Sequence, residues 1–225
     1  MALKVSAGGG DFEQVPVGQT PAICYKIVDA GTREEQWKDD PPKPRHLIFI
    51  NWELPEHQLA DGRPMSIHKQ YTHSLNENSN LFKDLKSWRG RAFTAEELAG
   101  FDLMNILGVS CEVSVVKNAN DRSVVDGVFK PDGGAKKTET VNELQAFDLE
   151  EYCNEFNGNS SEKSKEMCDV YEDLPPFMQT MITESFEVKA AMEKGGNSPK
   201  PNGGLGALAT EEKATEDLTD DDIPF

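Results

Sequence analysis

Hydrophobic and polar residues alternate along five stretches of the first 131 residues, and a period of two is the pattern of β-strands. The stretches are 20–32, 46–56, 65–75, 104–118 and 122–131. The second is almost continuously apolar and follows a proline-rich, charged segment at 33–45, which predicts a long loop. In the third, one face carries Met65, Ile67, Lys69 and Tyr71. The first three strands are therefore expected to form an antiparallel meander.

Between the third and fourth strands the period changes to that of a helix. A short helix is expected to begin at Ser79 or Asn80, which are good N-cap residues, and to end at Gly90. Thr94 followed three residues later by Glu97 is a capping box, which predicts a second helical turn or two. The sequence therefore predicts a helical insertion in the β region.

Three strands, a helical insertion and two strands predict a mainly β fold. Within about 110 residues this order is typical of the five-stranded Greek-key barrel called the oligonucleotide/oligosaccharide-binding (OB) fold, with its helix between strands 3 and 4. Other small β barrels and sandwiches give the same five runs and remain the alternative. We expect four parts: a flexible N-terminus at 1–14, the OB-fold domain at 15–135, an acidic extension with a C-terminal helix at 136–194, and a disordered linker with an acidic tip at 195–225.

The acidic extension shows weak periodicity. Residues 150–173 are polar and charged, and we expect part of this segment to form an extension or a mobile loop. Asp173 is then expected to cap a helix that ends at Gly195 and whose apolar face includes Phe177. We expect this helix to dock on the core, with binding of a partner protein as the alternative.

The charge of the chain is unevenly distributed. Its 40 acidic and 23 basic residues would ordinarily argue against a nucleic-acid partner, because binding to phosphates is driven mainly by lysine and arginine. Through Lys130, however, there are 15 basic and 18 acidic residues, a net charge of −3, whereas the remainder has 8 and 22, a net charge of −14. A nucleic-acid partner for the first half is therefore compatible with the composition.

Aromatic and basic residues are interleaved through the predicted strands and the first helix. Sequence-tolerant binding of single strands needs flat aromatic faces on which bases stack and cations along the path of the backbone. The candidate residues are Tyr25, Lys26, Arg33, Trp37, Lys38, Arg45, Phe49, Trp52, Lys69, Tyr71, Trp88, Arg89 and Arg91. Core packing is the alternative for Phe49 and Trp88, and a solvated strand face is the alternative for Lys26 and Lys69. Trp37 is the most informative, since a charged, proline-rich loop offers it no obvious core.

Signatures of catalysis are absent from the sequence. It has no phosphate-binding glycine loop, nucleophile elbow or HExxH motif. The four cysteines lack CxxC spacing and the histidines have no matching ligand spacing, so we expect no metal and no cofactor. Free thiols fit a reducing cytoplasm. Because there is no basic-then-apolar leader and no apolar run of about 20 residues, we expect neither export nor a membrane span.

The last nine residues, DLTDDDIPF, combine an acidic stem with an apolar tip. A partner could hold the carboxylates with basic side chains and the phenyl ring in an apolar slot. The candidate docking residues are Asp220, Asp221, Asp222, Ile223, Pro224 and Phe225. A solubilising tail is the alternative, and it accounts for the aspartates but not for the apolar tip.

The residues DDDIPF resemble the C-terminal tip of bacterial single-stranded DNA-binding proteins, which recruit replication and repair enzymes through it. The stretches YKIVDAGT, HLIFINWELP, DGRPMSIHKQYTHSL and SNLFKDLKSWRGRAFTAEELAGF resemble a family of bacteriophage single-stranded DNA-binding proteins with an OB fold, over roughly residues 15–130. This resemblance implies the fold and the activity. It does not fix the contact residues, which rest on strand faces and side-chain chemistry.

The sequence therefore predicts a non-enzymatic protein that coats single-stranded DNA in phage replication, recombination and repair. Its partners are expected to be single-stranded DNA and, through the acidic tip, a helicase, polymerase, nuclease or primase, in the host cytoplasm. The oligomeric state stays open, with a homodimer among the alternatives. The rival hypothesis is an acidic decoy that occupies host tail-binding pockets without binding DNA.

Overall fold

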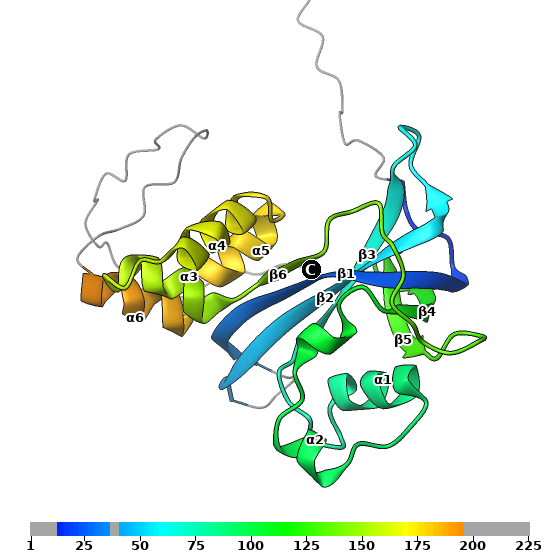
Figure 1. The fold of residues 1–225 in the computed structure, drawn as a ribbon, viewed down its shortest axis with the longest axis horizontal. Helices are drawn as coiled ribbons and strands as arrows, with labels where there is room; N and C mark the ends of the chain where they lie inside the picture. The colour runs from blue at the N-terminus through cyan, green and yellow to red at the C-terminus, as the bar shows by residue number, and fades with distance from the viewer. Residues whose placement is uncertain (1–12, 37–40, 196–225) are drawn as a thin grey trace, which may run out of the picture.

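The computed structural model describes residues 13–36 and 41–195 and shows one sheet with helices on both sides (Figure 1). The strands are β1 (Gly18–Glu35), β2 (Lys43–Gln58), β3 (Pro64–Thr72), β4 (Ser110–Lys117), β5 (Ser123–Phe129) and β6 (Gln145–Phe147). Their order is β3-β2-β1-β4-β5, all antiparallel, and β6 pairs in parallel with β1. The mainly β prediction and all five predicted strands are confirmed. β6 is an additional strand that the alternation does not reveal.

The hairpin of β1 and β2 is longer than the alternation predicts. Arg33 lies opposite Arg45, and Glu35 lies opposite Lys43, so both ends of the expected loop belong to the sheet. Once the apolar centre of the hairpin is aligned, polar residues extend it through backbone hydrogen bonds alone. The two strands therefore project a polar, partly basic end.

The sheet has ends at β3 and β5, and no ladder joins them in the described part of the chain. The closed five-stranded barrel is therefore not confirmed. The two strands are instead linked by Lys69 on β3, whose ammonium donates to the carbonyl of Asp126 on β5 at 2.7 Å and pairs with Asp84 at 2.8 Å. The side chain of Lys69 thus connects the two edge strands, which in a closed barrel would be joined by backbone hydrogen bonds.

The predicted helical insertion is confirmed. It comprises α1 (Asn80–Arg89), α2 (Ala95–Ala99) and the 3₁₀ helix η1 (Leu103–Ile106). Ser79 accepts from the amide of Phe82 as N-cap, Gly90 ends α1 with φ 65°, and the capping box of Thr94 and Glu97 is present. Leu81, Leu85 and Trp88 of α1 enter a core with the inner face of the sheet.

Four helices follow β6: α3 (Leu149–Phe156), α4 (Glu162–Glu172), α5 (Pro176–Thr183) and α6 (Phe186–Gly195). Part of 150–173 was expected to form an extension or a mobile loop, but α3 and α4 occupy most of this segment. Both helices have side-chain N-caps, Asp148 and Ser161, and their few apolar residues gather in one buried cluster. A short amphipathic helix needs only two or three such residues, so its period is hidden among charges.

The predicted C-terminal helix is divided in two. Its cap assignment was wrong, because Asp173 ends α4 and the N-cap of α5 is Pro175. α5 ends at Thr183, with Glu184 as its C-cap. The hydroxyl of Ser185 then accepts a hydrogen bond from the amide of Val188 in α6. The docking expectation is confirmed, since Met178, Ile182 and Val188 are fully buried against the sheet cluster.

β2 is buried on both faces, which explains its continuous apolar run. Ile48, Ile50, Trp52 and Leu54 point into the core shared with α1, whereas Leu47 and Phe49 point into the core shared with α3–α6. Each core removes large apolar side chains from water, which is the main stabilising term in folding. The sheet therefore separates two hydrophobic clusters.

Polar contacts fix α6 on the sheet. Glu187 accepts from the amide and the hydroxyl of Thr32 at 2.8 and 2.6 Å, and Asp29 lies 2.6 Å from Nε2 of His46. The hydrogen bond with Asp29 raises the pKa of His46. Gly31 sits at this seam with φ 75°, and a Cβ there would lie 2.6 Å from Leu149. Close approach of the helices therefore requires glycine in β1.

None of the helices in the described ranges is both long enough and apolar enough to cross a membrane. The expected flexible N-terminus lies almost wholly outside the described residues, as does the expected linker with its acidic tip.

Candidate nucleic-acid interface

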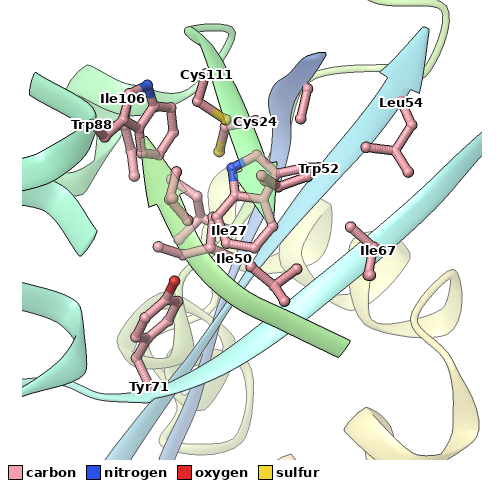
Figure 2. Close-up of a cluster of buried hydrophobic side chains, with 14 of the residues drawn as sticks. Cys24, Ile27, Ile50, Trp52, Leu54, Ile67, Tyr71, Trp88, Ile106 and Cys111 are labelled. Atoms are coloured by element: carbon pink, nitrogen blue, oxygen red, sulfur yellow. The ribbon is translucent and has the colours of Figure 1, made fainter. Parts of the chain in front are cut away.

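Four of the predicted stacking aromatics lie in the core. Phe49, Trp52, Tyr71 and Trp88 are 2, 0, 2 and 2% exposed. Figure 2 shows Trp52, Trp88 and Tyr71 pointing inward among Ile50 and Ile106. Trp88 donates to the carbonyl of Ser110 at 2.8 Å and Tyr71 donates to Asp84 at 2.8 Å, so their polar atoms are also satisfied internally. Base stacking is therefore not available to these four rings, and the core alternative weighed for Phe49 and Trp88 holds.

Two of the predicted cations are also committed to internal contacts. Lys69 forms the link between β3 and β5, and its side chain is 16% exposed. Arg89 pairs with Glu97 and lies 4.4 Å from the ring centroid of Phe93, with its side chain 12% exposed. Neither is free to follow a nucleic-acid backbone.

The alternation predicted for β3 is correct, but its exposed side is the opposite one. Met65, Ile67 and Tyr71 are buried, whereas the other face is open. This face carries four residues that we call the β3 strip: Ser66, His68, Gln70 and Thr72. The signal for them is in the sequence, since polar residues alternate with apolar ones and polar residues face water. The prediction chose the opposite face of the strand because that face contains the aromatic residue Tyr71.

An aromatic pair stands beside the β3 strip. The ring of His68 stacks on the ring of Phe177 from α5, with centroids 5.3 Å apart and planes inclined by 28°. Phe49 contacts both rings edge-on at 5.9 Å and supports them from the core. Phe177 is 44% exposed, although its helix docks on the sheet. The pair therefore presents an open, flat apolar surface. From the sequence, Phe177 was expected to pack on the core as part of a docked helix.

Tyr25 and Lys26 lie in the same region of the outer face. Lys26 is opposite Asn51 in β2, which is itself opposite His68 in β3. The Lys26 ammonium is 6.0 Å from the ring centroid of Tyr25. Both side chains are half-buried. These two predicted residues are therefore brought together with the β3 strip.

Partial burial shifts the pKa values of this region. Burial lowers the pKa of His68, so its ring is neutral at pH 7 and stacks without adding charge. Burial also lowers the pKa of Lys26, against the nearby carboxylates of Asp173 and Glu143, and raises that of Tyr25. The centre of the surface is consequently suited to flat bases more than to phosphates.

Cations are found where the β3 strip meets the β1–β2 hairpin. Arg33 and Arg45 are cross-strand neighbours, and Arg33 is 3.6 Å from Glu184. Arg45, Gln70 and Thr72 line a groove of about 480 Å³ that continues along the loop after β3. The groove also contains the side chains of Asn76, Asn78 and Asn80. It offers one arginine and several amides to a polar backbone, with the carboxylate of Glu35 at its edge bound to Gln70 at 3.2 Å.

The remaining candidate binding residues lie in separate parts of the chain. Arg91 is exposed just beyond the end of α1, outside the β3 strip, and pairs with Glu97 at 2.7 Å. Trp37 and Lys38 fall outside the described residues. The docking residues 220–225 also fall outside them.

Metal ligands are not grouped in the described ranges: no three His, Cys, Asp or Glu side chains there are placed to hold an ion. The four cysteines are free thiols.

Comparisons with known proteins add no family. No protein-family model matches the chain, and no curated protein matches it significantly.

Proposed function

We propose that the protein binds single-stranded DNA without sequence preference along the outer face of β3. The observation that carries the proposal is the open pair of His68 and Phe177, which lies on the same face as the groove of Arg45. Flat rings at the centre and cations at one end are the two elements that single-strand binding needs.

The strand order supports the proposal that the sheet is an open variant of the OB fold. In β3-β2-β1-β4-β5, β3 and β5 are the two strands that a barrel would join, and both run in the direction of β1. The helix α1 contacts both of them, and Lys69 links them. In OB folds the second and third strands form the ligand face. The proposed site therefore lies where this fold would place it.

The first test is a titration of labelled oligo-dT with residues 1–195. We expect binding to single strands in preference to duplex, because bases in a duplex cannot reach the aromatic pair. If four to six phosphates are neutralised, the log–log dependence of the binding constant on salt should have a slope of about −3 to −4. Fluorescence anisotropy at several salt concentrations measures both quantities. Equal affinity for duplex, or no binding at low salt, would refute the proposal.

We further propose that the acidic tip recruits enzymes of DNA replication or repair. The support is the sequence DDDIPF, in which an apolar tip follows an acidic stem. Phe225→Ala keeps every aspartate, so it should leave the affinity for oligo-dT unchanged. It should abolish capture of a helicase, polymerase, nuclease or primase from the replicating system, because the apolar slot of the partner is left empty. Undiminished capture in a pull-down with Phe225→Ala would leave the tail a solubilising role only.

A further inference from the structure

A second groove lies on α1, next to the groove of Arg45. Its volume is about 660 Å³, and its walls include Lys83, Lys86 and Arg91. Phe82 forms part of the floor, with its ring stacked on Phe93 at 5.2 Å. Basic walls and an apolar floor are suited to a ligand that is both anionic and partly apolar.

The groove of α1 carries excess positive charge. Lys83 and Lys86 are exposed and form no ion pair within the described residues. Lys130 adds a fourth cation at the end of α1, because its side chain packs on Gly90. Against these four stand Glu77, which lines the groove, and Glu97, which is bound to Arg91 and Arg89. The groove itself is thus lined by three cations and one carboxylate.

The two grooves meet at the loop that joins β3 to α1. Asn76, Asn78 and Ser79 line the groove of Arg45, and Glu77 of the same loop lines the groove of α1. The loop is held by its own hydrogen bonds, since the hydroxyl of Ser79 donates to the carbonyl of Ser74 at 2.7 Å and Asn76 accepts from the amide of Asn78 at 3.0 Å. A single strand of DNA that extends beyond the β3 strip would therefore pass over this loop and reach Lys83 and Lys86.

We infer that the groove of α1 is the continuation of the single-stranded DNA path, in which Lys83 and Lys86 hold backbone phosphates. This inference rests on the proposed function and adds the direction of the strand: from the aromatic pair, along β3, over the loop at 74–80 and onto α1. A strand is the occupant because the groove adjoins the groove of Arg45 at the loop that joins β3 to α1 and its charge complements phosphate. The site then accommodates a longer oligonucleotide than the β3 strip alone.

The test compares two lengths of oligo-dT on the full chain and on Lys83→Gln/Lys86→Gln. An oligonucleotide of about 5 nucleotides covers the β3 strip, and one of about 15 also reaches α1, within the range of site sizes for this fold. The double variant should bind the longer oligonucleotide about 10- to 30-fold more weakly near 0.1 M salt, and its salt slope should fall by about 1.4, since each lost phosphate contact removes about 0.7. Binding of the shorter one should be unchanged.

The matched control is Lys163→Gln/Lys165→Gln on α4, which removes the same charge from another exposed helix. It should leave both affinities nearly unchanged. Undiminished binding of the longer oligonucleotide by Lys83→Gln/Lys86→Gln, or an equal loss for both lengths, would overturn the inference while leaving single-strand binding itself intact. Absence of binding at both lengths in the unaltered protein would instead overturn the proposed function.

Discussion

Phe177→Ala is expected to weaken binding of oligo-dT by about 1–3 kcal/mol, a factor of roughly 5 to 150 in Kd. This is the range for loss of one base–aromatic stack, and Phe177 is 44% exposed. The ring packs on His68 and only its edge contacts Phe49, so the fold should lose little. Anisotropy titration gives the affinity, and thermal unfolding gives the stability of the same variant.

Phe186→Ala is the control for this result. Phe186 is also 44% exposed, but it begins α6 and is not part of the aromatic pair. Its removal should not change the affinity for DNA. Phe177→Trp should keep or strengthen binding, because stacking requires a flat face and not a particular ring. If Phe177→Ala and Phe186→Ala bind oligo-dT as tightly as the unaltered protein, the aromatic pair is not the base-stacking surface.

Much of the fold can be predicted from the sequence because strands and caps are local features. The alternation at 65–75 and the caps at Ser79, Thr94 and Gly90 are set by neighbouring residues, and all are present in the structure. The helices at 149–172 are different. Their stability comes from packing of Leu149, Tyr152 and Met167 against the far side of the sheet, a contact that local sequence does not record. The prediction therefore failed in the region whose helices are stabilised by tertiary burial.

The candidate site could be predicted only in part, because aromatic residues serve two purposes. Trp52 and Trp88 have the chemistry of stacking residues, but their rings lie 6.3 Å apart inside the core. A small sheet needs large side chains to fill its interior, and tryptophan does this as well as it stacks on bases. Phe177 shows the converse, since a residue of a docked helix remains open. Side-chain type identifies candidates, whereas strand direction and neighbouring helices decide which of them face water.

The position of Phe177 depends on the segment that leads from β5 to the helices. This segment is fixed to the sheet by Glu53, which is 1% exposed in β2. Its carboxylate accepts from the amides of Val141 and Asn142 at 3.0 and 2.7 Å and from the side chain of Asn142 at 2.6 Å. Three donors compensate a buried negative charge that would otherwise be costly. Glu53 therefore links the outer face of β2 to the chain that continues into β6 and the helices.

Glu53→Gln should lower the free energy of unfolding by about 2–4 kcal/mol, because one oxygen of the amide cannot replace two carboxylate oxygens and its NH₂ group faces donors. The expected fall in Tm is about 5–15 °C. Glu56→Gln is the matched control, since Glu56 lies in the same strand, is exposed and loses the same charge. Loosening of 139–143 should also make that segment more sensitive to proteolysis and weaken DNA binding through displacement of Phe177. Thermal unfolding of both variants, with limited proteolysis, measures these effects. Equal stability of Glu53→Gln and Glu56→Gln would show that the buried carboxylate does not hold the helices on the sheet, and the aromatic pair would then depend on the apolar packing of α5 alone.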